Sequence, residues 1–410
     1  MQNKIILHCD MNNFYASVEC KKDPSLAVFP VAVGGDVEER TGIILAKNYI
    51  AKSYGVKTGD TVYEAVKKCP GLKVLPPDFR EYVRHSHLAK EIYQRYTDMV
   101  EPFGLDECWL DVTASRGLFG DGETIANKIR NDIKKELGIT ASVGVSFNKI
   151  FAKLGSDMKK PDAVTIIDEA SFRQTIWHLP ASDLMGVGRK TLKKINSVGI
   201  YTIGQLAKYP KKELKSMLGK WGEYLWQYAN GLDDSPVVPG EIYIPEKSIG
   251  HGITTRKDMT DKNEVWCVML ELCQEIGHRL YSCNMAARGI AIQIKDNKFN
   301  VKQWQKKVYP TLQSPFKIAT EAYSLFNANY TWNSPVRAVS IRAIDLYPKG
   351  EGEQIDIFRQ SDEKNLLLDM TIEKLRERYG KDIIKNGCLL NHPLLGGDIS
   401  SLTAKMAEEA

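Results

Sequence analysis

The first 170 residues alternate between short apolar runs and amphipathic stretches. Residues 4–10 and 42–46 are apolar and partly β-branched, as is typical of buried strands. Residues 80–100 and 123–137 repeat apolar side chains every three or four positions, which predicts two helices that each bury one face. Three more apolar runs predict strands, at residues 107–113, 140–146 and 163–167. This order predicts an α/β layer in which helices cover a sheet.

Residues 20–77 interrupt this pattern and carry turn signals of their own. Lys22-Asp23-Pro24 and Cys69-Pro70-Gly71 are combinations that favour turns. We therefore expect this segment to form a small subdomain inserted into the α/β layer.

Short helices are predicted after residue 181, and the glycines among them indicate a phosphate site. Gly186 and Gly188 stand directly before Arg189 and Lys190, in a pattern that resembles a helix-hairpin-helix. A tight turn of this kind presents backbone N–H groups, and the helix N-terminus behind it adds a favourable dipole. Such contacts would position a phosphate backbone without reading base sequence. The alternative is an ordinary corner between two helices.

Residues 232–247 are rich in Pro, Asp and Gly and are interpreted as a linker. Beyond the linker, strands and helices are predicted in the order β-α-β-β-α-β, at residues 248–254, 263–283, 288–295, 299–309, 315–328 and 335–345. This order indicates a four-stranded sheet with two helices on one face. The other face of the sheet would be free to meet a duplex backbone.

Charge is unevenly placed along the chain, although the total is only +5. Residues 1–180 carry 24 basic and 24 acidic side chains, whereas residues 181–231 carry nine basic and three acidic ones. Residues 242–345 carry 14 basic and nine acidic side chains, and residues 346–410 carry nine and 12. A basic middle beside a neutral first part suits a protein that grips a polyanion with one region and performs chemistry with another.

Composition favours an intracellular enzyme without a membrane segment. No apolar run approaches the roughly 18–20 residues that cross a bilayer, and no signal peptide precedes Ile5. The eight cysteines are scattered without a Cys-x-x-Cys pair, so we expect reduced thiols rather than a zinc site or a disulfide framework. These features predict a cytoplasmic protein.

Carboxylates at two of the predicted strands are the main candidates for chemistry. Asp10 ends the first strand, and the adjacent pair Asp106 and Glu107 opens another. Three carboxylates at neighbouring strand ends could hold two divalent cations, the arrangement used in phosphoryl and nucleotidyl transfer. Adjacent residues of a regular strand point to opposite faces, so both acids face one site only if the chain bends there. Gly104, just upstream, makes such a bend feasible.

The motifs around these acids closely resemble the Y family of DNA polymerases, the lesion-bypass enzymes of the DNA polymerase IV and UmuC type. Residues 10–19, Asp-Met-Asn-Asn-Phe-Tyr-Ala-Ser-Val-Glu, are similar to the family's first palm motif. Residues 106–111, Asp-Glu-Cys-Trp-Leu-Asp, are similar to its second. The resemblance covers about residues 1–345 and implies an α+β, α/β multidomain fold shaped like a right hand. The implied parts are a palm (1–19 and 78–168), fingers (20–77), a helical thumb (169–231), the linker, a little finger (248–345) and a tail (346–410).

The resemblance also implies the roles of the acidic residues. Asp10, Asp106 and Glu107 would be catalytic and would hold two Mg²⁺ ions, with the Met11 carbonyl as a further ligand. One metal would lower the pKa of the primer 3′-hydroxyl, and the other would neutralise the triphosphate and the leaving pyrophosphate. Magnesium is expected because all of these ligands are hard oxygens.

Further residues match the family's nucleotide site. Tyr15 matches the steric gate, whose ring leaves no room for a ribose 2′-hydroxyl, and Phe14 would pack near the nucleotide. In a fingers motif at residues 48–56, Tyr49 and Lys52 would bind the triphosphate, as would Lys160.

The chain departs from the family pattern at three of these places. Lys52 replaces the commoner arginine, so the charge remains but the bidentate fork is lost. The family has a glycine after the proline that corresponds to Pro161, whereas this chain has Asp162-Ala163 there. Asn12 stands where many members have aspartate. We expect little effect from Asn12, because that position is not one of the implied metal ligands.

The tail contains a sequence similar to the bacterial sliding-clamp-binding pentapeptide. It consists of Gln354, Ile355, Asp356, Ile357 and Phe358. A polar anchor with two apolar side chains suits an extended peptide that docks in a groove of a clamp. The alternative is a short edge strand. A helix is predicted at residues 362–379, and no role is assigned to residues 380–410.

The sequence thus predicts a monomeric, template-directed DNA polymerase that uses primed DNA and dNTPs. It would act with low fidelity in translesion synthesis, would lack a proofreading exonuclease, and would be recruited by a sliding clamp. One alternative is a non-catalytic DNA- and clamp-binding scaffold of the same fold, which would be expected to have lost one or more of the acids. Another is a different palm-based transferase such as a nucleotide cyclase, which leaves the basic region and the clamp peptide unexplained.

Overall fold

A computed structural model describes residues 4–35, 42–240, 246–349, 363–380 and 383–389. The chain divides into two compact units, the first made of residues 1–34 and 44–243, and the second of residues 35–43 and 244–410. Each unit has its own hydrophobic core, so each is described by itself.

A five-stranded sheet forms the centre of the first unit, in the order β5-β6-β1-β7-β8. The strands are β1 (Ile6–Met11), β5 (Val100–Pro102), β6 (Glu107–Asp111), β7 (Ala141–Ser146) and β8 (Val164–Ile167). β1 is central and pairs antiparallel with both β6 and β7, whereas β7 and β8 run parallel. This arrangement confirms the predicted strands and places the two acidic motifs on neighbouring strands.

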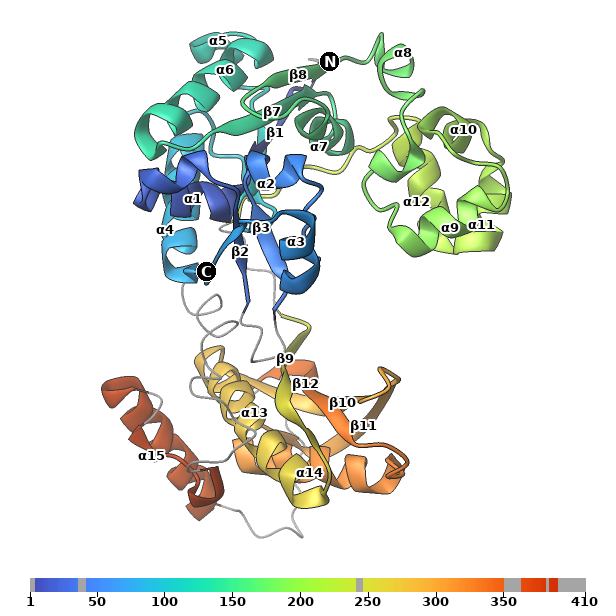
Figure 1. Ribbon diagram of the computed structural model, residues 1–410. Helices are drawn as coiled ribbons and strands as arrows, with labels where there is room; N and C mark the ends of the chain where they lie inside the picture. Colours follow the sequence, from blue (N-terminus) through green and yellow to red (C-terminus); the bar gives the residue numbers. More distant parts are fainter. Residues whose placement is uncertain (1–3, 36–41, 241–245, 350–362, 381–382, 390–410) are drawn as a thin grey trace. The chain divides into compact units, whose positions relative to one another are not determined.

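Helices cover both faces of this sheet, as Figure 1 shows for α6 (Gly122–Asp132) and α7 (Lys149–Met158). Leu7, Cys9 and Met11 of β1 pack in the core with α4 (Phe79–Gln94) and α6. Ile6 packs with Ala152 of α7, and the ring of His8 bonds to Ser156 of the same helix. Because both faces are covered, every residue of β1 is buried, including the polar His8 and Asp10. Asp10 shares the face of Ile6 and His8.

Two helices differ from their predicted bounds. α4 ends at Gln94, and Tyr96 packs in the core from the turn that follows, where its hydroxyl donates to Asp132 at 2.7 Å. The apolar spacing therefore continued past the helix end. The predicted helix at 123–137 is α6 followed by a π-helical turn, η2 (Ile133–Leu137), before Gly138. The short helix α5 (Arg116–Phe119) precedes α6.

The segment predicted as an inserted subdomain has a small sheet and core of its own. After α1 (Phe14–Lys22) and η1 (Pro24–Val28), the strands pair in the order β3-β2-β4. Its elements are β2 (Val31–Gly34), β3 (Ile44–Lys47), α2 (Tyr49–Ser53), α3 (Val62–Lys68) and β4 (Lys73–Leu75). The buried side chains are Ala32, Ile44, Ala51, Val56, Ala65 and Cys69.

Short helices follow β8, as the sequence predicted. They are α8 (Phe172–Ile176), η3 (Ala181–Asp183), α9 (Arg189–Asn196), α10 (Ile203–Lys208), α11 (Lys211–Leu218) and α12 (Lys220–Ala229). Gly186 has φ +90°, and a Cβ there would lie 2.5 Å from the Trp221 ring, whose Nε1 donates to the Gly186 carbonyl at 3.1 Å. The turn before α9 therefore requires glycine for both its backbone angle and its packing.

The described part of the predicted linker packs against the sheet. Val237 is buried, and the Val238 N–H donates to Glu101 Oε2 at 2.8 Å. Glu101 also pairs with Lys149 Nζ at 2.5 Å, and the Gly240 N–H donates to the carbonyl of Val100 at 3.0 Å. Pro, Asp and Gly therefore mark an irregular segment here, but one that is fixed on the edge strand β5.

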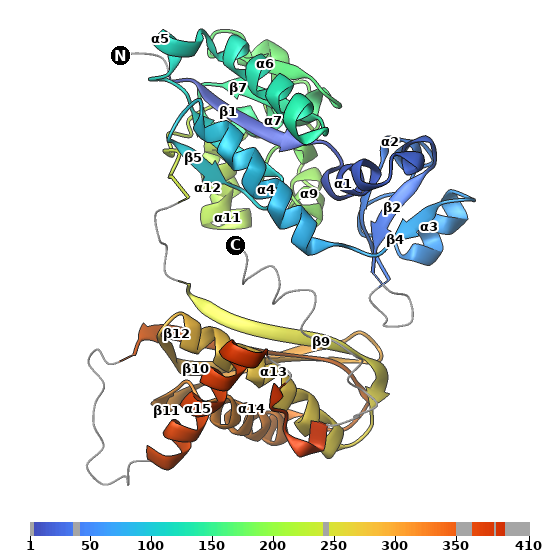
Figure 2. The ribbon, with the colours of Figure 1, turned by 90° about the vertical axis from the view of Figure 1, so that its left-hand side faces the viewer.

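The second unit is a four-stranded sheet in the order β11-β10-β12-β9, with α13 and α14 on one face (Figure 2). Its elements are β9 (Ser248–Met259), α13 (Lys262–Ser282), β10 (Met285–Asp296), β11 (Val301–Leu312), α14 (Pro315–Asn329) and β12 (Val336–Pro348). All neighbouring strands are antiparallel. The predicted β-α-β-β-α-β order and the two-layer arrangement are confirmed.

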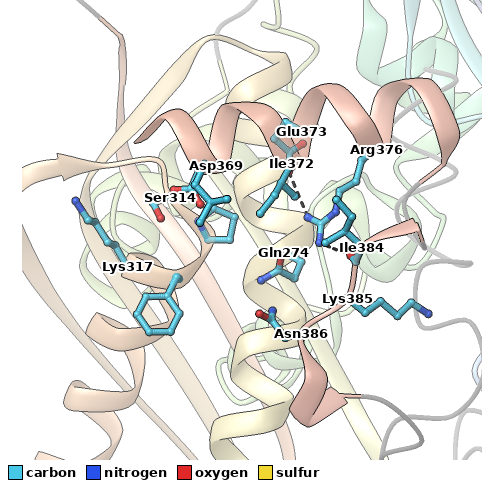
Figure 3. Close-up of a pocket in the computed structure, with 13 residues that line it drawn as sticks. Gln274, Ser314, Lys317, Asp369, Ile372, Glu373, Arg376, Ile384, Lys385 and Asn386 are labelled. Carbon is cyan, nitrogen blue, oxygen red and sulfur yellow. Dashed lines mark hydrogen bonds and ion pairs between the residues drawn. The ribbon is translucent and has the colours of Figure 1, made fainter. Parts of the chain in front are cut away.

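A further helix, α15 (Glu363–Tyr379), packs beside α13 in the second unit. Glu373 of α15 pairs with His278 of α13 at 2.7 Å and with Arg376 at 3.3 Å. Arg376 also donates to the Ile384 carbonyl, and Glu373, Arg376 and Ile384 are among the residues that line a cavity of about 290 Å³ (Figure 3). The short helix η5 (Gly387–Leu389) follows. The predicted clamp peptide, residues 354–358, lies outside the described residues.

Candidate active site

The strand register brings the two acidic motifs together. Asp10 of β1 lies directly opposite Glu107 of β6, so both side chains share one face of the sheet. Asp106 stands just before β6, and its carbonyl accepts the Met11 N–H at 3.0 Å. Gly104 has φ +84°, which provides the bend that the adjacent acids require.

In the free chain, a lysine pairs with each of two acids. Lys160 Nζ donates to Asp10 Oδ2 at 2.7 Å and lies 3.0 Å from Asp157 Oδ1. Lys153 of α7 pairs with Glu107, whose Oε2 also lies 3.2 Å from His8 Nε2. His8 is fully buried, and its Nδ1 lies 2.8 Å from Ser156 Oγ. Asp10 is therefore held in place by a lysine, and Glu107 by a lysine and a buried ring.

Burial and pairing shift the three carboxyl pKa values in different directions. Burial raises the pKa of Asp10 to about 6, although Lys160 opposes that shift. Burial, together with the neighbouring Glu107, raises the pKa of Asp106 to about 6. For Glu107, burial is outweighed by hydrogen bonds from His8 and Lys153, which lower its pKa to about 2. Asp10 and Asp106 are thus buried acids whose negative charge the protein alone does not fully compensate.

These residues fit a divalent cation by their chemistry. The donor set is all hard oxygen, and two of its acids have pKa values raised by burial, an effect that a bound cation would reverse. Among the described residues, no three His, Cys, Asp or Glu side chains are already grouped as a metal site.

Tyr15 is held at a fixed orientation beside this site by two other rings. It stacks on Tyr82 with ring centres 4.2 Å apart and 10° between planes, and it meets Phe79 edge-on at 5.9 Å. Tyr82 is itself fixed by a 2.7 Å hydrogen bond to Glu19. Phe14 is only 3% exposed and packs in the core, with its ring centre 5.6 Å from that of Tyr15. Its contact with a nucleotide stays a prediction.

The predicted triphosphate residues come from two elements of the first unit. Tyr49 and Lys52 lie on α2. Asn48 caps this helix, because its Oδ1 accepts the Ala51 N–H at 2.9 Å. Burial raises the pKa of Tyr49, while Lys160 lowers it, so the two groups are within electrostatic reach. Lys52 Nζ lies 5.4 Å from the Tyr49 ring centre.

The sequence analysis missed several residues of this site. Lys153 and His8 were not predicted, although Lys153 falls four positions after Lys149 on the same helix. Lys47 was also missed; its pKa is lowered by burial and by the nearby Lys52. Asn12, from which little effect was expected, is buried and bonded to the loop that carries Lys160.

The predicted phosphate turn is open to solvent. Gly186, Gly188, Arg189 and Lys190 are all exposed, and α9 begins directly after Gly188. The geometry thus leaves the N-terminus of α9 accessible.

No helix in the described residues is long and apolar enough to cross a membrane.

Comparisons with known proteins match three parts of the chain. Residues 9–157 match the impB/mucB/samB family, residues 246–357 match the C-terminal domain of that family, and residues 182–233 match the thumb domain of DNA polymerase-iota. The chain is 48% identical over 389 residues to DNA polymerase IV of Acetivibrio thermocellus, covering 94% of this chain and 98% of that protein. The chain belongs to the Y family of DNA polymerases.

Other relatives agree with this assignment. DNA polymerase IV 1 of Bacillus subtilis is 38% identical over 95% of this chain and 94% of its own length. The solved structure of the Y-family DNA polymerase chimera Dbh-Dpo4(243-245)-Dbh superposes with a TM-score of 0.72 at 23% identity, covering 83% of this chain and 98% of that one. The predicted Y-family fold, with palm, thumb and C-terminal little finger, is confirmed. The chain is a DNA-directed DNA polymerase of the translesion type.

Proposed function

We propose that this polymerase joins dNTPs to a primer 3′ end at a two-metal site made of Asp10, Asp106, Glu107 and the Met11 carbonyl. The observation that carries the proposal is the cross-strand pair of Asp10 and Glu107, with Asp106 adjacent at a bend. The raised pKa values of Asp10 and Asp106 support it, because these buried acids lack full compensation by the protein itself. Retention of all three acids argues against the scaffold alternative.

In the reaction, the primer 3′-oxygen forms a bond to the α-phosphorus and the bond to the pyrophosphate oxygen breaks. Mg²⁺, when bound, would supply Lewis acidity that favours transfer of the 3′-hydroxyl proton to water and stabilises the leaving pyrophosphate. Asp10, Asp106 and Glu107 would hold the cations. Lys160, released from Asp10, is then available to pair with the triphosphate, together with Tyr49 and Lys52.

Tyr15 would select deoxyribose over ribose. Its ring cannot tilt away freely, because Tyr82 stacks on one side and Phe79 meets its edge. A ring held rigidly against the sugar would clash with a 2′-hydroxyl. Relieving such a clash costs free energy, because the neighbouring rings would have to move.

Two surfaces would hold DNA through its backbone. The exposed turn at Gly186 and Gly188, followed by Arg189 and Lys190, suits a phosphate. On the sheet of the second unit, the face opposite α13 and α14 carries the exposed Lys307 and Arg342. The peptide 354–358 would recruit a sliding clamp, and the enzyme would act as a low-fidelity monomer.

Primer extension with dNTPs and Mg²⁺ tests the metal site, by comparison of the natural chain with Asp106→Ala. We expect extension to fall by about 10³-fold or more, because one of the charged groups that organise the transition state is lost. Affinity for primed DNA should stay unchanged, since the proposed DNA contacts lie elsewhere. Undiminished extension in the variant would contradict the proposed site, and DNA binding without extension by the natural chain would favour the scaffold alternative.

A further inference from the structure

Asn12 lies directly after β1, two positions from Asp10, and its side chain is buried at 1% exposure. The loop that follows α7 and contains Lys160 contacts this side chain. An amide in this place is neither a proposed metal ligand nor part of the hydrophobic core. Its contacts therefore indicate what it does.

The side-chain oxygen of Asn12 accepts two short hydrogen bonds and lies 3.5 Å from the Ser142 hydroxyl, and the side-chain nitrogen donates one hydrogen bond. Oδ1 accepts the backbone N–H of Asp162 at 2.9 Å and the Thr140 hydroxyl at 3.0 Å. Nδ2 donates to Ser142 Oγ at 3.0 Å. Thr140 and Ser142 lie at and next to the start of β7, so they orient the amide from the sheet while the amide holds the loop.

Asp162 is also fixed from its other side. Its carboxylate pairs with Arg130 Nη1 at 2.8 Å and with Lys134 Nζ at 2.9 Å, on α6 and η2. Its φ of +54° is one that aspartate adopts more readily than most residues, yet it still needs support from neighbours. The backbone at 162 is thus clamped between the Asn12 amide and the two cations.

Lys160 is only two residues before this anchor, separated from it by Pro161. Proline restricts the backbone between the two, so a shift at 162 is transmitted to 160. The Lys160 ammonium lies 2.7 Å from Asp10 Oδ2. Asp10 is on β1, the strand that ends directly before Asn12. Asn12 therefore connects the strand of the first acid to the loop of the lysine that pairs with it.

We propose that Asn12 is a positioning residue for the triphosphate-binding lysine, acting through its hydrogen bond to the Asp162 N–H. The proposal rests on the proposed role of Lys160 at the triphosphate. Without the amide, the Asp162 N–H would lose its partner in a buried place, and the loop would move to recover one. Small displacements of a positioned charge are sufficient to weaken substrate binding strongly.

Aspartate at position 12 would preserve this function. A carboxylate can accept the same bonds from the Asp162 N–H and the Thr140 hydroxyl, and the Ser142 hydroxyl can rotate to donate. Alanine would remove all three bonds. The pair Asn12→Asp and Asn12→Ala therefore separates the hydrogen-bonding role from mere occupancy of the space.

The test measures dNTP affinity without turnover, as equilibrium binding of a dNTP to the enzyme on a template with a dideoxy-terminated primer. It also measures KM and kcat for single insertion on an ordinary primer. Asn12→Ala should raise the dNTP Kd and KM by about tenfold. Its kcat should stay within about threefold, and Asn12→Asp should restore Kd and KM to within about threefold of the natural chain.

A double-mutant cycle shows whether Asn12 acts through Lys160. In a Lys160→Ala background, Asn12→Ala should change the dNTP Kd by less than about twofold, because the group it positions is already absent. Ser142→Ala loosens the amide from the sheet but leaves its bond to the Asp162 N–H, so the dNTP Kd should rise by no more than about two- to threefold, less than in Asn12→Ala.

Several outcomes would overturn the proposal. An unchanged Kd in a folded Asn12→Ala would refute it, as would an equal tenfold effect in the Lys160→Ala background. If Lys160→Ala itself leaves dNTP affinity unchanged, the proposed role of Lys160 fails, and the role of Asn12 with it. If Asn12→Ala does not fold by circular dichroism, Thr140→Val replaces it in the cycle, with an expected two- to threefold rise in Kd that Lys160→Ala removes; no rise would refute the proposal.

Discussion

The paired charges of the acidic site in the first unit are largely buried, whereas Lys307 and Arg342 on the open sheet face of the second unit are exposed. Asp10 is 6% exposed and shares a 2.7 Å hydrogen bond with Lys160, and Glu107 is held by Lys153 and His8. Lys307 and Arg342 instead project from β11 and β12 into solvent. The same side-chain types are thus used in two different ways.

The proposed functions of the two regions explain this difference. Nucleotidyl transfer depends on the distance between reacting atoms, so its side chains must be held by neighbours before substrate arrives. Grip on a DNA backbone depends mainly on the number of positive charges near phosphates, and it tolerates movement of each charge. Substitutions that change shape but keep the charge should therefore impair the first region. In the second region, substitutions that remove charge should matter more than those that change shape.

Among the predictions that compare the two regions, the largest effect concerns the exposed charges. Lys307→Ala combined with Arg342→Ala should weaken binding to primed DNA by roughly tenfold per lost contact at about 0.1 M salt. The slope of log K against log salt should become shallower by about 0.9 per contact. Binding is measured by fluorescence anisotropy over a salt series.

The exchange variants Lys307→Arg and Arg342→Lys provide the matched control for that experiment. They keep the charge, so DNA affinity and salt slope should equal those of the natural chain. A strong loss in these variants would show that the second unit also depends on shape, and the contrast between the regions would fail.

The next effect concerns shape in the first unit. Tyr15→Ala opens space under the sugar and should reduce discrimination against ribonucleotides by about 10- to 100-fold, on the scale of relieved overpacking. Relative kcat/KM for dNTP and rNTP insertion measures it. Tyr15→Phe keeps the ring and its stacking on Tyr82, so it should keep most of the discrimination. Unchanged discrimination in Tyr15→Ala would assign the gate to another residue.

The smallest effect concerns stability. The pKa of Asp106 is raised from 3.8 to about 6, so the folded chain holds this proton more tightly than the unfolded chain. Stability therefore falls as the pH rises between these two values and stays reduced above pH 6. Asp106→Asn should therefore raise the free energy of unfolding of the metal-free chain by about 1–2 kcal/mol at pH 7.5, after allowance for partial exposure. The gain should vanish near pH 4, where the acid is protonated in the folded chain.

Thermal unfolding in a chelating buffer at the two pH values measures this difference. Arg342→Gln in the second unit is the control, and its unfolding temperature should move little, because the group is exposed. A variant Asp106→Asn that is less stable than the natural chain at pH 7.5 would show that the ionised acid is compensated within the protein.

The sequence alone determined the elements and the chemistry that they carry. The apolar run of β1, the helical spacing of α6 and the β-α-β-β-α-β order of the second unit are local patterns, and local patterns survive folding. Asp10, Asp106 and Glu107 were predicted as metal ligands from their places at strand ends and from the family motifs. The structure pairs Asp10 with Glu107 across the strands, and their role in metal binding stays a prediction. The helix bounds were less certain, since Tyr96 keeps the apolar spacing beyond the end of α4.

Only the tertiary structure decided which residues act together. Asp10 meets Lys160 from 150 positions away, and Asn12 meets Asp162 across the same separation. Such pairs depend on strand register and on the docking of α7 against the sheet, and neither leaves a periodic signal in the sequence. The segment predicted as a linker is fixed at Glu101 for the same reason. Composition describes what a segment tolerates, whereas long-range hydrogen bonds determine where it lies.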